Sequence, residues 1–370
     1  MTRPSPWLLL CKPVRAPFRD GTSVLVRNLL RALPSSFEAV YFGDPRAPIR
    51  ERGDRVLPAS AMRYQPGLAD KLGMFARTLA PAQARLPIHS LFAANATSSR
   101  ALELLRRTPL QRPVIQTLPA STGAERVASM LARLDRVVVT SSWGRTRLLD
   151  AGLDAARVVR IYPGVELPPS TGLPPLSTRR SLLYAGDLDP AVGERLIALA
   201  DALESREGWC LDIATRPKGE RHEAVRRRLR TALAPALEAG RARLHGEVED
   251  IDALFDRAAL QLYLADHARN KVDIPFALLE GMARGLPVAI VDAEPVAELL
   301  ELADAAGLEV GLRLSSALGR DEPSTTALLA ALDDPQRLAQ MGSKARELVE
   351  RHFSATEMAT SYHRLYERTA

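Results

Sequence analysis

Short apolar segments alternate with amphipathic ones along almost the whole sequence, and this alternation constrains the fold more than any other feature. In the first half the apolar segments span five or six residues each, which predicts strands buried on both faces of a sheet. We expect strands at 7–11, 38–42, 88–93, 113–117, 136–141 and 158–162, and helices at 22–33, 68–80, 98–107, 124–134 and 142–152. Because strands joined through helices pair in parallel, the pattern predicts doubly wound parallel sheets of the α/β class.

The alternation is interrupted at residues 163–180, which hold five of the 27 prolines and no periodic apolar face. Such a stretch is typical of a linker between domains. Beyond it we expect strands at 181–186, 209–214, 242–246, 260–265 and 287–291, with helices between them and two closing helices. A chain of 370 residues also fits two domains better than one. The sequence therefore predicts two Rossmann-like domains, with a ligand crevice between the carboxyl ends of their sheets.

The predicted domain boundaries follow from this interruption. We expect an N-terminal domain at 1–166, a proline-rich linker at 167–180 and a second domain at 181–352. The remaining residues, 353–370, form an amphipathic helix that we expect to pack back on the N-terminal domain.

Several classes of protein are disfavoured by what the sequence lacks. The two cysteines, Cys11 and Cys210, lie far apart and match neither a metal motif nor a disulfide framework. No zinc pattern, Walker loop or Gly-x-Ser-x-Gly elbow occurs. The longest apolar run near the N-terminus is too short for a membrane span or a signal peptide. We therefore expect a cytoplasmic chain without a membrane anchor.

Positive charge is concentrated in the first half of the chain. Residues 1–168 hold 25 lysines and arginines against 12 acidic residues, whereas residues 169–370 hold 25 against 32. Arginine-rich codon usage would explain this excess without any partner. The functional interpretation is an anionic partner, such as a phosphate-bearing acceptor, a membrane surface or nucleic acid. Nucleic acid ranks last, because no helix-turn-helix, zinc-finger or aromatic-rich basic pattern occurs.

Five segments carry a family resemblance. They read VVVTSSWGRTRLLDAGLDAARVVRIYPGVEL, LLYAGDLDP, RLHGEVEDIDALFDRAAL, ALLEGMARGLPVAIVD and MGSKARELVERHFSATEMATSYHRLYE, in this order. Together they resemble the GT-B glycosyltransferases of family four, the retaining group that includes glycogen synthase and sucrose synthase. The resemblance covers nearly the whole chain, and five segments in register are far more specific than one. It implies the GT-B fold and a nucleotide-diphosphate sugar as co-substrate, with no bound metal and no tightly held cofactor.

The resemblance gives a role to an acid that the local pattern leaves unexplained. Glu280 is the single carboxylate of the helix FALLEGMAR. In the family this acid binds the ribose of the donor, whose two neighbouring hydroxyls can both donate to one carboxylate. The interpretation without a ligand is that Glu280 stabilises the start of its helix. Gly285 fits the left-handed position that ends the helix, and Gly281 allows close packing on the sheet.

The loop before this helix departs from the family pattern. The family places a first Glu eight residues before the second, where this chain has Val272. Asp273 is one residue away and is our candidate for the missing acid, with Lys271 beside it. In the resemblance the backbone that follows the acid faces the sugar, which adds the donor-binding candidates Ile274, Pro275 and Phe276.

A second departure concerns the donor phosphates. The glycine of LLYAG, Gly186, is itself a donor-binding candidate. After it the family has an Arg and then a Lys that both contact the diphosphate, whereas this chain has Asp187 and Val192. Each lost charge-assisted bond to phosphate costs about 1.5–3 kcal/mol unless another cation replaces it. The candidate replacements are Arg216 and Lys218, which follow the next strand at its carboxyl end. The alternative interpretation of this segment is a solvated loop.

The first domain supplies the acceptor-side candidates. Gly21 stands where the family carries a glycine-rich loop, and Thr22 or Ser23 can cap the helix that follows. The residues that we expect on the acceptor side are Arg15, Arg19, Asp20 and Asn95, with Arg15, Arg19 and Arg27 forming a basic patch. The candidates for catalysis are Asp20, His89 and Asp273, although a lone histidine is more often structural.

The function predicted from these observations is transfer of a sugar from a nucleotide-diphosphate sugar to a hydroxyl, with retention. The resemblance implies cell-envelope polysaccharide or other glycoconjugate synthesis, and the basic first half fits an anionic, lipid-linked acceptor at the inner membrane face. One alternative is a catalytically weak GT-B module that binds a partner protein or a glycan, because the family's first acid and both cations are missing. Others are transfer to a nucleic-acid or small-molecule acceptor, and a sugar-nucleotide epimerase on the same fold.

Overall fold

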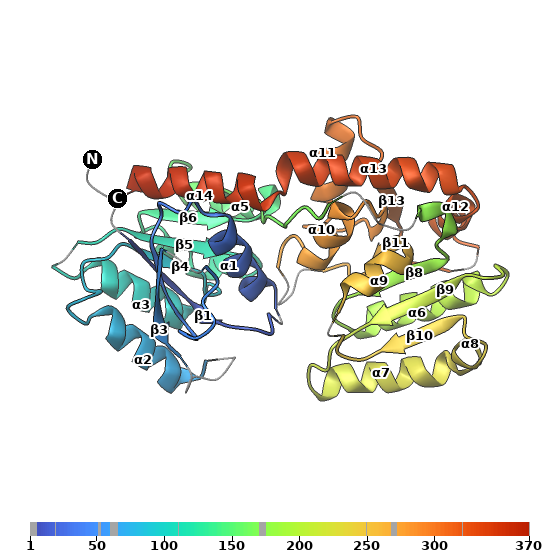
Figure 1. Cartoon of the computed structure of the whole chain (residues 1–370), viewed down its shortest axis with the longest axis horizontal. Helices are drawn as coiled ribbons and strands as arrows, with labels where there is room; N and C mark the ends of the chain where they lie inside the picture. The colour runs from blue at the N-terminus through green and yellow to red at the C-terminus, as the bar shows by residue number, and fades with distance from the viewer. Residues whose placement is uncertain are drawn as a thin grey trace. The chain divides into compact units, whose positions relative to one another are not determined.

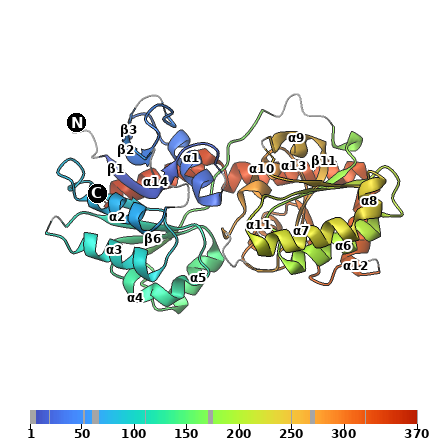
Figure 2. The same ribbon diagram turned by 90° about the horizontal axis from the view of Figure 1, so that it is seen from below.

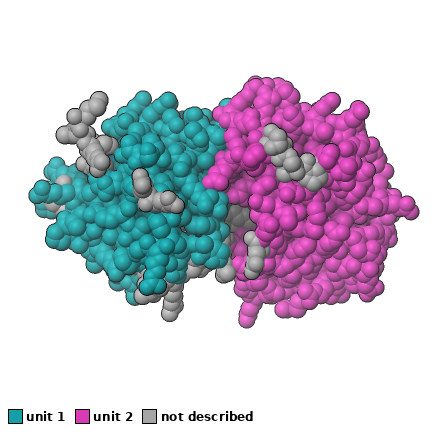
Figure 3. All heavy atoms as spheres, viewed as in Figure 1, with its two compact units in different colours: residues 1–164, 268–274, 352–370 teal, residues 165–267, 275–351 magenta. Residues whose placement is uncertain are grey.

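Two parallel sheets, one in each of two units of the chain, carry the fold (Figure 1). The structure is a computed structural model that describes residues 6–18, 20–50, 53–59, 66–109, 111–169, 175–248, 250–267, 272–319 and 321–369. Unit 1 comprises Met1–Gly164, Ala268–Ile274 and His352–Ala370, and unit 2 comprises Val165–His267 and Pro275–Arg351 (Figure 3). The predicted fold class, two Rossmann-like regions with doubly wound parallel sheets, is confirmed.

The sheet of unit 1 has seven parallel strands in the order β3-β2-β1-β4-β5-β6-β7. Their bounds are β1 (Trp7–Val14), β2 (Ala39–Gly43), β3 (Asp54–Pro58), β4 (Ile88–Ser90), β5 (Val114–Leu118), β6 (Arg136–Val139) and β7 (Val158–Arg160). Strands β2, β4 and β5 are buried along their whole length, as expected of parallel strands covered by helices on both faces. The chain order reverses between β1 and β4, which makes this pair the switch point of the sheet.

Helices cover both faces of this sheet. They are α1 (Gly21–Ala32), α2 (Leu68–Thr78), α3 (Ala96–Arg106), the short η1 (Ala124–Val127), α4 (Ala128–Leu131), α5 (Ser142–Asp150) and the C-terminal α14 (Ala355–Thr369). Side chains of β1 alternate between the faces. Leu8 and Leu10 join the core that α2, α3, α4 and α5 cover, whereas the ring of Trp7 lies 4.6 Å from that of Tyr366 in α14. Helix α14 therefore packs on the opposite face, next to α1.

Gly164 packs against the start of α14. Its N–H donates to Met358 Sδ at 3.0 Å, and its carbonyl oxygen accepts from Asn28 Nδ2 at 2.8 Å. A Cβ at this position would lie 2.6 Å from the carbonyl oxygen of Ser354 and 2.7 Å from Cα of Ala355, closer than van der Waals contact permits. Only glycine therefore lets the backbone approach the start of α14 this closely.

The sheet of unit 2 has six parallel strands in the order β10-β9-β8-β11-β12-β13. Their bounds are β8 (Ser181–Ala185), β9 (Cys210–Ala214), β10 (Ala242–His245), β11 (Ala258–Tyr263), β12 (Val288–Val291) and β13 (Gly311–Leu314). The helices are η2 (Leu176–Thr178), α6 (Pro190–Leu203), α7 (Glu220–Ala232), α8 (Ala234–Glu238), α9 (Asp252–Arg257), α10 (Phe276–Ala283), α11 (Glu298–Ala305), α12 (Pro323–Leu332) and α13 (Pro335–His352). The switch point here lies between β8 and β11.

The core of unit 2 lies mainly on one face of its sheet. Leu196 of α6, Leu229 of α7 and Leu328 of α12 are fully buried there against the apolar residues of β8, β9 and β11. A smaller cluster on the other face gathers around Phe255 of α9 and Leu286. Among the described helices, none has both the length and the hydropathy needed to cross a bilayer.

The structure differs from the sequence-based expectations at several places. Strands β3 and β13 were not predicted. Both lie at an edge of their sheet and are less buried than the central strands, so their sequences, DRVLP and GLRL, lack a long apolar run. Residues 268–274 belong to unit 1, although their position in the sequence placed them in the second domain. Helix α1 begins at Gly21 and is capped by Asp20, not by Thr22 or Ser23.

We predict that Gly164→Ala destabilises the protein by about 1–3 kcal/mol, because the added methyl group collides with backbone atoms that cannot move away. A matched control is Gly73→Ala in the middle of α2, where a Cβ would meet no atom within 4 Å. That change should raise stability by about 0.5–1 kcal/mol through better helix propensity. Chemical denaturation followed by circular dichroism checks both values, and equal stability of the two variants would contradict the packing argument.

Candidate functional site

Open α/β sheets bind ligands outside the carboxyl ends of the strands at their switch point. In unit 2 this point lies between β8 and β11, with β9 next to β8. The loops after these strands, residues 186–189, 215–219 and 264–267, therefore gather at one edge of the sheet. The glycine predicted to contact the donor, Gly186, opens the first of these loops.

Asp187 is the centre of an ion cluster at this edge. Lys218 Nζ lies 2.5 Å from its Oδ2, and Arg216 Nε lies 3.8 Å from its Oδ1. The structure thus brings both candidate replacement cations to the position where the family has its Arg. The two cations share one carboxylate, so this group of three side chains keeps one net positive charge.

Val192 stands at the position of the family's lysine and is fully buried. From the first turn of α6 it joins the hydrophobic core of unit 2 together with Leu188 and Leu196. Its N–H donates to the carboxylate of Asp189, which caps α6 at 3.0 Å. A lysine ammonium placed here without a counter-charge would lose its hydration, so a phosphate-binding cation has to come from another loop.

A second charged group at this edge was not found from the sequence. The buried guanidinium of Arg195 donates to the carboxylate of Asp266 at 2.5 Å and to two backbone carbonyl oxygens at 2.8 Å each. The hydrogen bond from Arg195 lowers the pKa of Asp266 below its usual range. His267 Nε2 lies 3.4 Å from Asp189 Oδ2. Charged positions of an amphipathic helix are expected to face solvent, so the pattern carried no signal for a buried Arg195.

Helix α10 has the geometry that its glycines predicted. Gly285 has a φ of 78° and follows the last turn, and Gly281 packs so closely on β11 that a Cβ would overlap Gln261 Oε1. Gln261 Nε2 in turn donates to the carbonyl oxygen of Ala277 at 2.9 Å. Both predicted glycine roles are confirmed. Glu280 is half-buried on this helix, one position before Gly281.

Asp273 is a structural residue of unit 1. It is fully buried, and its carboxylate accepts from Ser121 N at 2.8 Å, from Ser121 Oγ at 2.6 Å and from Ser141 Oγ at 2.6 Å. Ser141 also caps α5 through the N–H of Gly144 at 2.9 Å. The interpretation of Asp273 as a catalytic acid or sugar ligand is wrong for this structure, because its carboxylate is out of reach of solvent.

The residues that follow Asp273 can offer a sugar backbone amides rather than side chains. The side chains of Ile274 and Phe276 are buried, and Pro275 has no N–H to donate. Lys271 lies outside the described residues. The first amide that this loop could present after the acid is therefore that of Ile274.

The candidates at the switch point of unit 1 take mainly structural roles. Asp20 caps α1, accepting from Ser23 N at 3.1 Å, and forms an ion pair with Lys12 Nζ at 3.0 Å. Asn95 caps α3, accepting from Ser98 N at 3.0 Å. Arg15 is half-buried, Gly21 begins α1, and Arg19 lies outside the described residues. Capping does not prevent either side chain from meeting a ligand at its remaining lone pairs.

His89 is part of the core and does not face a ligand site. Its Nδ1 lies 2.7 Å from Tyr366 Oη and its Nε2 lies 2.7 Å from Thr117 Oγ1, which in turn contacts Tyr362 Oη at 3.0 Å. Burial lowers the pKa of His89 to about 3, so the ring is neutral. The interpretation of His89 as an accessible base is wrong, because the side chain is fully buried and its two nitrogens contact Tyr366 of α14 and Thr117 of β5.

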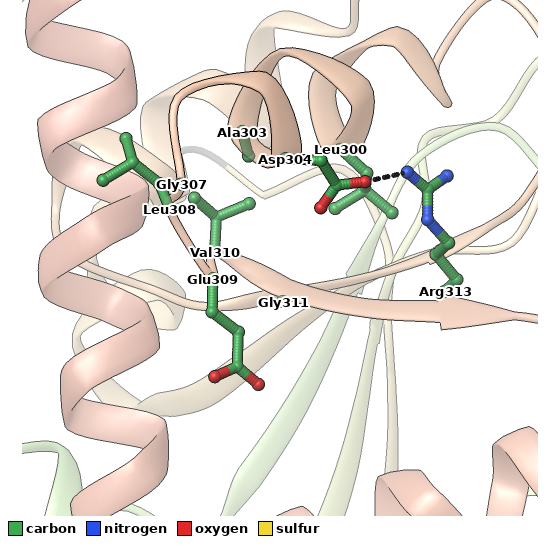
Figure 4. A pocket seen from close by; sticks show the side chains of 9 residues that line it. All are labelled: Leu300, Ala303, Asp304, Gly307, Leu308, Glu309, Val310, Gly311 and Arg313. Atoms are coloured by element: carbon green, nitrogen blue, oxygen red, sulfur yellow. Dashed lines mark hydrogen bonds and ion pairs between the residues drawn. The ribbon is translucent and has the colours of Figure 1, made fainter.

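A depression of about 330 Å³ lies elsewhere in unit 2, between the end of α11 and the start of β13 (Figure 4). Asp304 and Arg313 pair across it at 2.5 Å. Gly311, the first residue of β13, lines it, so the depression lies at the amino end of that strand and away from the ligand-binding edge. The described residues also contain no cluster of three or more His, Cys, Asp or Glu placed to hold a metal ion.

Comparisons with known proteins relate the chain to solved structures only. No family model matches the sequence, and no curated protein matches it either. HepE of Anabaena in complex with UDP aligns over 98% of this chain and 100% of its own, with a TM-score of 0.72 and 14% identity. Sucrose-phosphate synthase of Thermosynechococcus elongatus aligns over 98% of both chains, with a TM-score of 0.74 and 20% identity.

A glycosyltransferase of Rickettsia africae aligns over 100% of this chain and 99% of its own, with a TM-score of 0.74 and 13% identity. The chain has the GT-B fold. The resemblance that the sequence motifs carried is confirmed at the level of the fold. At such low identity the fold follows from these comparisons, and the chemistry has to be argued from the site.

We predict that the protein loses stability as the pH falls, in part through His89. The pKa of His89 is about 3 in the folded chain, below its ordinary value of 6.5, so between these values the unfolded chain binds the extra proton. The contribution is complete above about pH 6.5 and declines below it, by up to about 1.4 kcal/mol per pH unit. The free energy of unfolding, measured with denaturant at several pH values, should fall less steeply with pH in His89→Gln than in the wild type. The same slope in both proteins would contradict the role given to His89.

Proposed function

We propose that the chain is a glycosyltransferase that moves a sugar from a nucleotide-diphosphate sugar to a hydroxyl acceptor. The observation that carries the proposal is the GT-B fold over the full length of the chain, shared with HepE of Anabaena, whose structures contain UDP, UDP with glucose, and UDP-glucose. The cation cluster at the switch point of unit 2 supports it independently. This is the edge at which a doubly wound sheet receives a nucleotide.

The proposed reaction needs positioning and charge stabilisation more than acid–base chemistry. A bond forms between the acceptor oxygen and the anomeric carbon, while the bond from that carbon to the donor phosphate breaks. The acceptor proton is released, and the nucleoside diphosphate leaves with the bonding electrons. Cations and helix amides that bind the diphosphate more strongly as its charge grows would lower the barrier. Retention is the finer proposal, and it rests on the family resemblance.

We assign the ribose to Glu280 and the diphosphate to Arg216 and Lys218. Each charge-assisted bond to a phosphate oxygen contributes about 1.5–3 kcal/mol, whereas a partly exposed ion pair contributes about 0–1 kcal/mol. A diphosphate would therefore displace Asp187 from the two cations at a small cost. Asp187 acts in this proposal as an internal anion that the donor replaces.

The acceptor is proposed to bind unit 1, which contains most of the basic first half of the chain. A lipid-linked or otherwise anionic acceptor of cell-envelope glycoconjugate synthesis, used at the inner face of the membrane, fits that charge. Transfer to a small molecule or a nucleic acid remains an alternative acceptor choice.

A catalytically weak GT-B module is the second candidate function. It is favoured by Asp187 and Val192 at the family's cation positions and by the burial of Asp273, since all three remove family contacts to the donor. Incubation with UDP-, GDP-, ADP- and dTDP-sugars separates the two. Nucleotide release, with or without an acceptor, supports the enzyme; no release from any of these donors supports the module, which would bind a partner protein or a glycan instead.

A thermal-shift panel of the same nucleotides identifies the base. A ligand at 100 times its dissociation constant stabilises the fold by about 2.7 kcal/mol, which is readily visible in the melting curve. If no nucleotide or nucleotide sugar shifts the curve, sugar transfer is excluded, and the module that binds a partner protein or a glycan is the function that is left.

We predict that Glu280→Gln weakens binding of the stabilising nucleotide by about tenfold or more, because one charge-assisted acceptor of the ribose hydroxyls is lost. The melting temperature of the free protein should change little, since the side chain is half-buried. Glu238→Gln on the exposed face of α8 is the matched control and should bind as the wild type does. Isothermal titration measures both, and equal affinities in all three proteins would remove the ribose role.

We predict that changing Arg216 and Lys218 together to Ala abolishes detectable binding of the nucleoside diphosphate but spares the nucleoside. Asp187→Asn should do the opposite and tighten diphosphate binding several-fold, because the internal anion no longer competes. Arg227→Ala with Arg230→Ala, exposed on α7, is the charge-matched control. Retained diphosphate affinity in the Arg216, Lys218 double variant would assign the phosphates to other groups.

A further inference from the structure

Four leucines with exposed side chains gather on two neighbouring helices of unit 1. The exposed fractions are 66% for Leu68 and 60% for Leu72 in α2, 44% for Leu79 just after it, and 62% for Leu104 in α3. The fifth large exposed hydrophobic residue of the described chain, Leu167 at 38%, lies in unit 2. Single exposed leucines are ordinary in soluble proteins, but four of the five lie in one pair of helices or directly after one of them, which indicates a contact surface.

The helical spacing explains why these side chains face outward together. Leu68, Leu72 and Leu79 recur at intervals of four and seven residues, which places them on one stripe. The opposite side of α2 buries Met74, and α3 buries Leu102 and Leu105 in the same core cluster. The two helices therefore lie on one face of the sheet and next to each other, as Figures 1 and 2 both show.

The exposed charged side chains of α2 and α3 are all positive. Between residues 66 and 109 the sequence has two acids and six cations, which are Lys71, Arg77, Arg85, Arg100, Arg106 and Arg107. Neither acid is exposed: Asp70 is half-buried and accepts from Gly67 N at 3.0 Å, and Glu103 is buried and pairs with Arg107 at 2.8 Å. Lys71 and Arg100 are exposed, and within the described chain neither has an ion-pair partner.

We propose that this α2–α3 surface, formed by Leu68, Leu72, Leu79 and Leu104 with Lys71 and Arg100, docks on an anionic lipid bilayer. The leucines would enter the boundary between head groups and acyl chains, and the cations would meet lipid phosphates. Interfaces between proteins are instead enriched in aromatic residues and depleted in lysine, and no aromatic side chain of α2 or α3 is exposed. Anionic lipid is thus the partner that the surface complements in both apolarity and charge.

The docking does not depend on the proposed function. Both helices begin at the carboxyl edge of the unit 1 sheet, where α3 follows β4 directly. If the glycosyltransferase proposal is also right, the surface would hold unit 1 near lipid-borne acceptors. If no sugar transfer is found, lipid docking can still be measured by itself.

Co-sedimentation of the full chain with vesicles tests the proposal. We expect binding to vesicles of phosphatidylcholine mixed with phosphatidylglycerol, little binding to phosphatidylcholine alone, and release as salt rises. Leu72→Ser with Leu104→Ser should lower the partition coefficient by about tenfold, since two partly inserted leucines are lost. Leu167→Ser is the matched control and should bind as the wild type does. Circular dichroism verifies that each variant is folded.

A charge variant tests the second half of the proposal. Lys71→Gln with Arg100→Gln should weaken binding to the anionic vesicles, whereas Arg227→Gln with Arg230→Gln on α7 should not. No binding by the wild type, equal binding to neutral and anionic vesicles, or full binding by the leucine variant would each overturn the proposal. The proposal would also be overturned if the leucine variant bound vesicles normally but had a lower oligomeric mass in ultracentrifugation, because that result assigns the surface to a second copy of the chain.

Discussion

Unit 1 depends on two buried polar networks, each of which ties a late segment of the chain to its sheet. The carboxylate of Asp273 accepts three hydrogen bonds from Ser121 and Ser141, and His89 links Thr117 to Tyr366 of α14. A buried polar group that loses its partner costs about 1–3 kcal/mol, so neither segment can leave without exposing or orphaning these groups. Both segments belong to unit 1 although each follows a segment of unit 2, so the chain passes between the units four times.

The placement of positive charge at the switch point of unit 2 follows from the structural roles of Val192 and Asp189. Val192 belongs to the core beneath α6, and Asp189 caps that helix. These two positions in and before the first turn of α6 therefore carry no cation that could bind a phosphate. In the proposed site the cations come instead from the loop after β9, where Arg216 and Lys218 both pair with Asp187. An unliganded pair of cations would repel each other, and one carboxylate between them relieves that repulsion without fixing them strongly.

The fold was predictable from the sequence because burial on both faces leaves a strong apolar signal in each central strand. Edge strands such as β3 and β13 are covered less and were missed. The roles of Gly281 and Gly285 could also be predicted, since close packing and a positive φ are local requirements on the backbone. The roles of His89 and Asp273 could not, because their partners lie 277 and 152 residues away and leave no local pattern.

The charge excess of the first half shows the same limit. Much of it is structural: Arg50 pairs with Asp54, Arg112 is buried against the carbonyl oxygen of Thr78, and Arg157 donates to that of Leu134. Arg27, expected in a basic patch, lies over the ring of Phe18 at 5.3 Å. A net charge counts all of these equally, yet only a cation without a neighbouring counter-charge attracts an anionic surface at distances beyond contact. The partner of a basic domain is therefore set by the few cations that folding leaves unpaired, and by the apolar side chains exposed beside them.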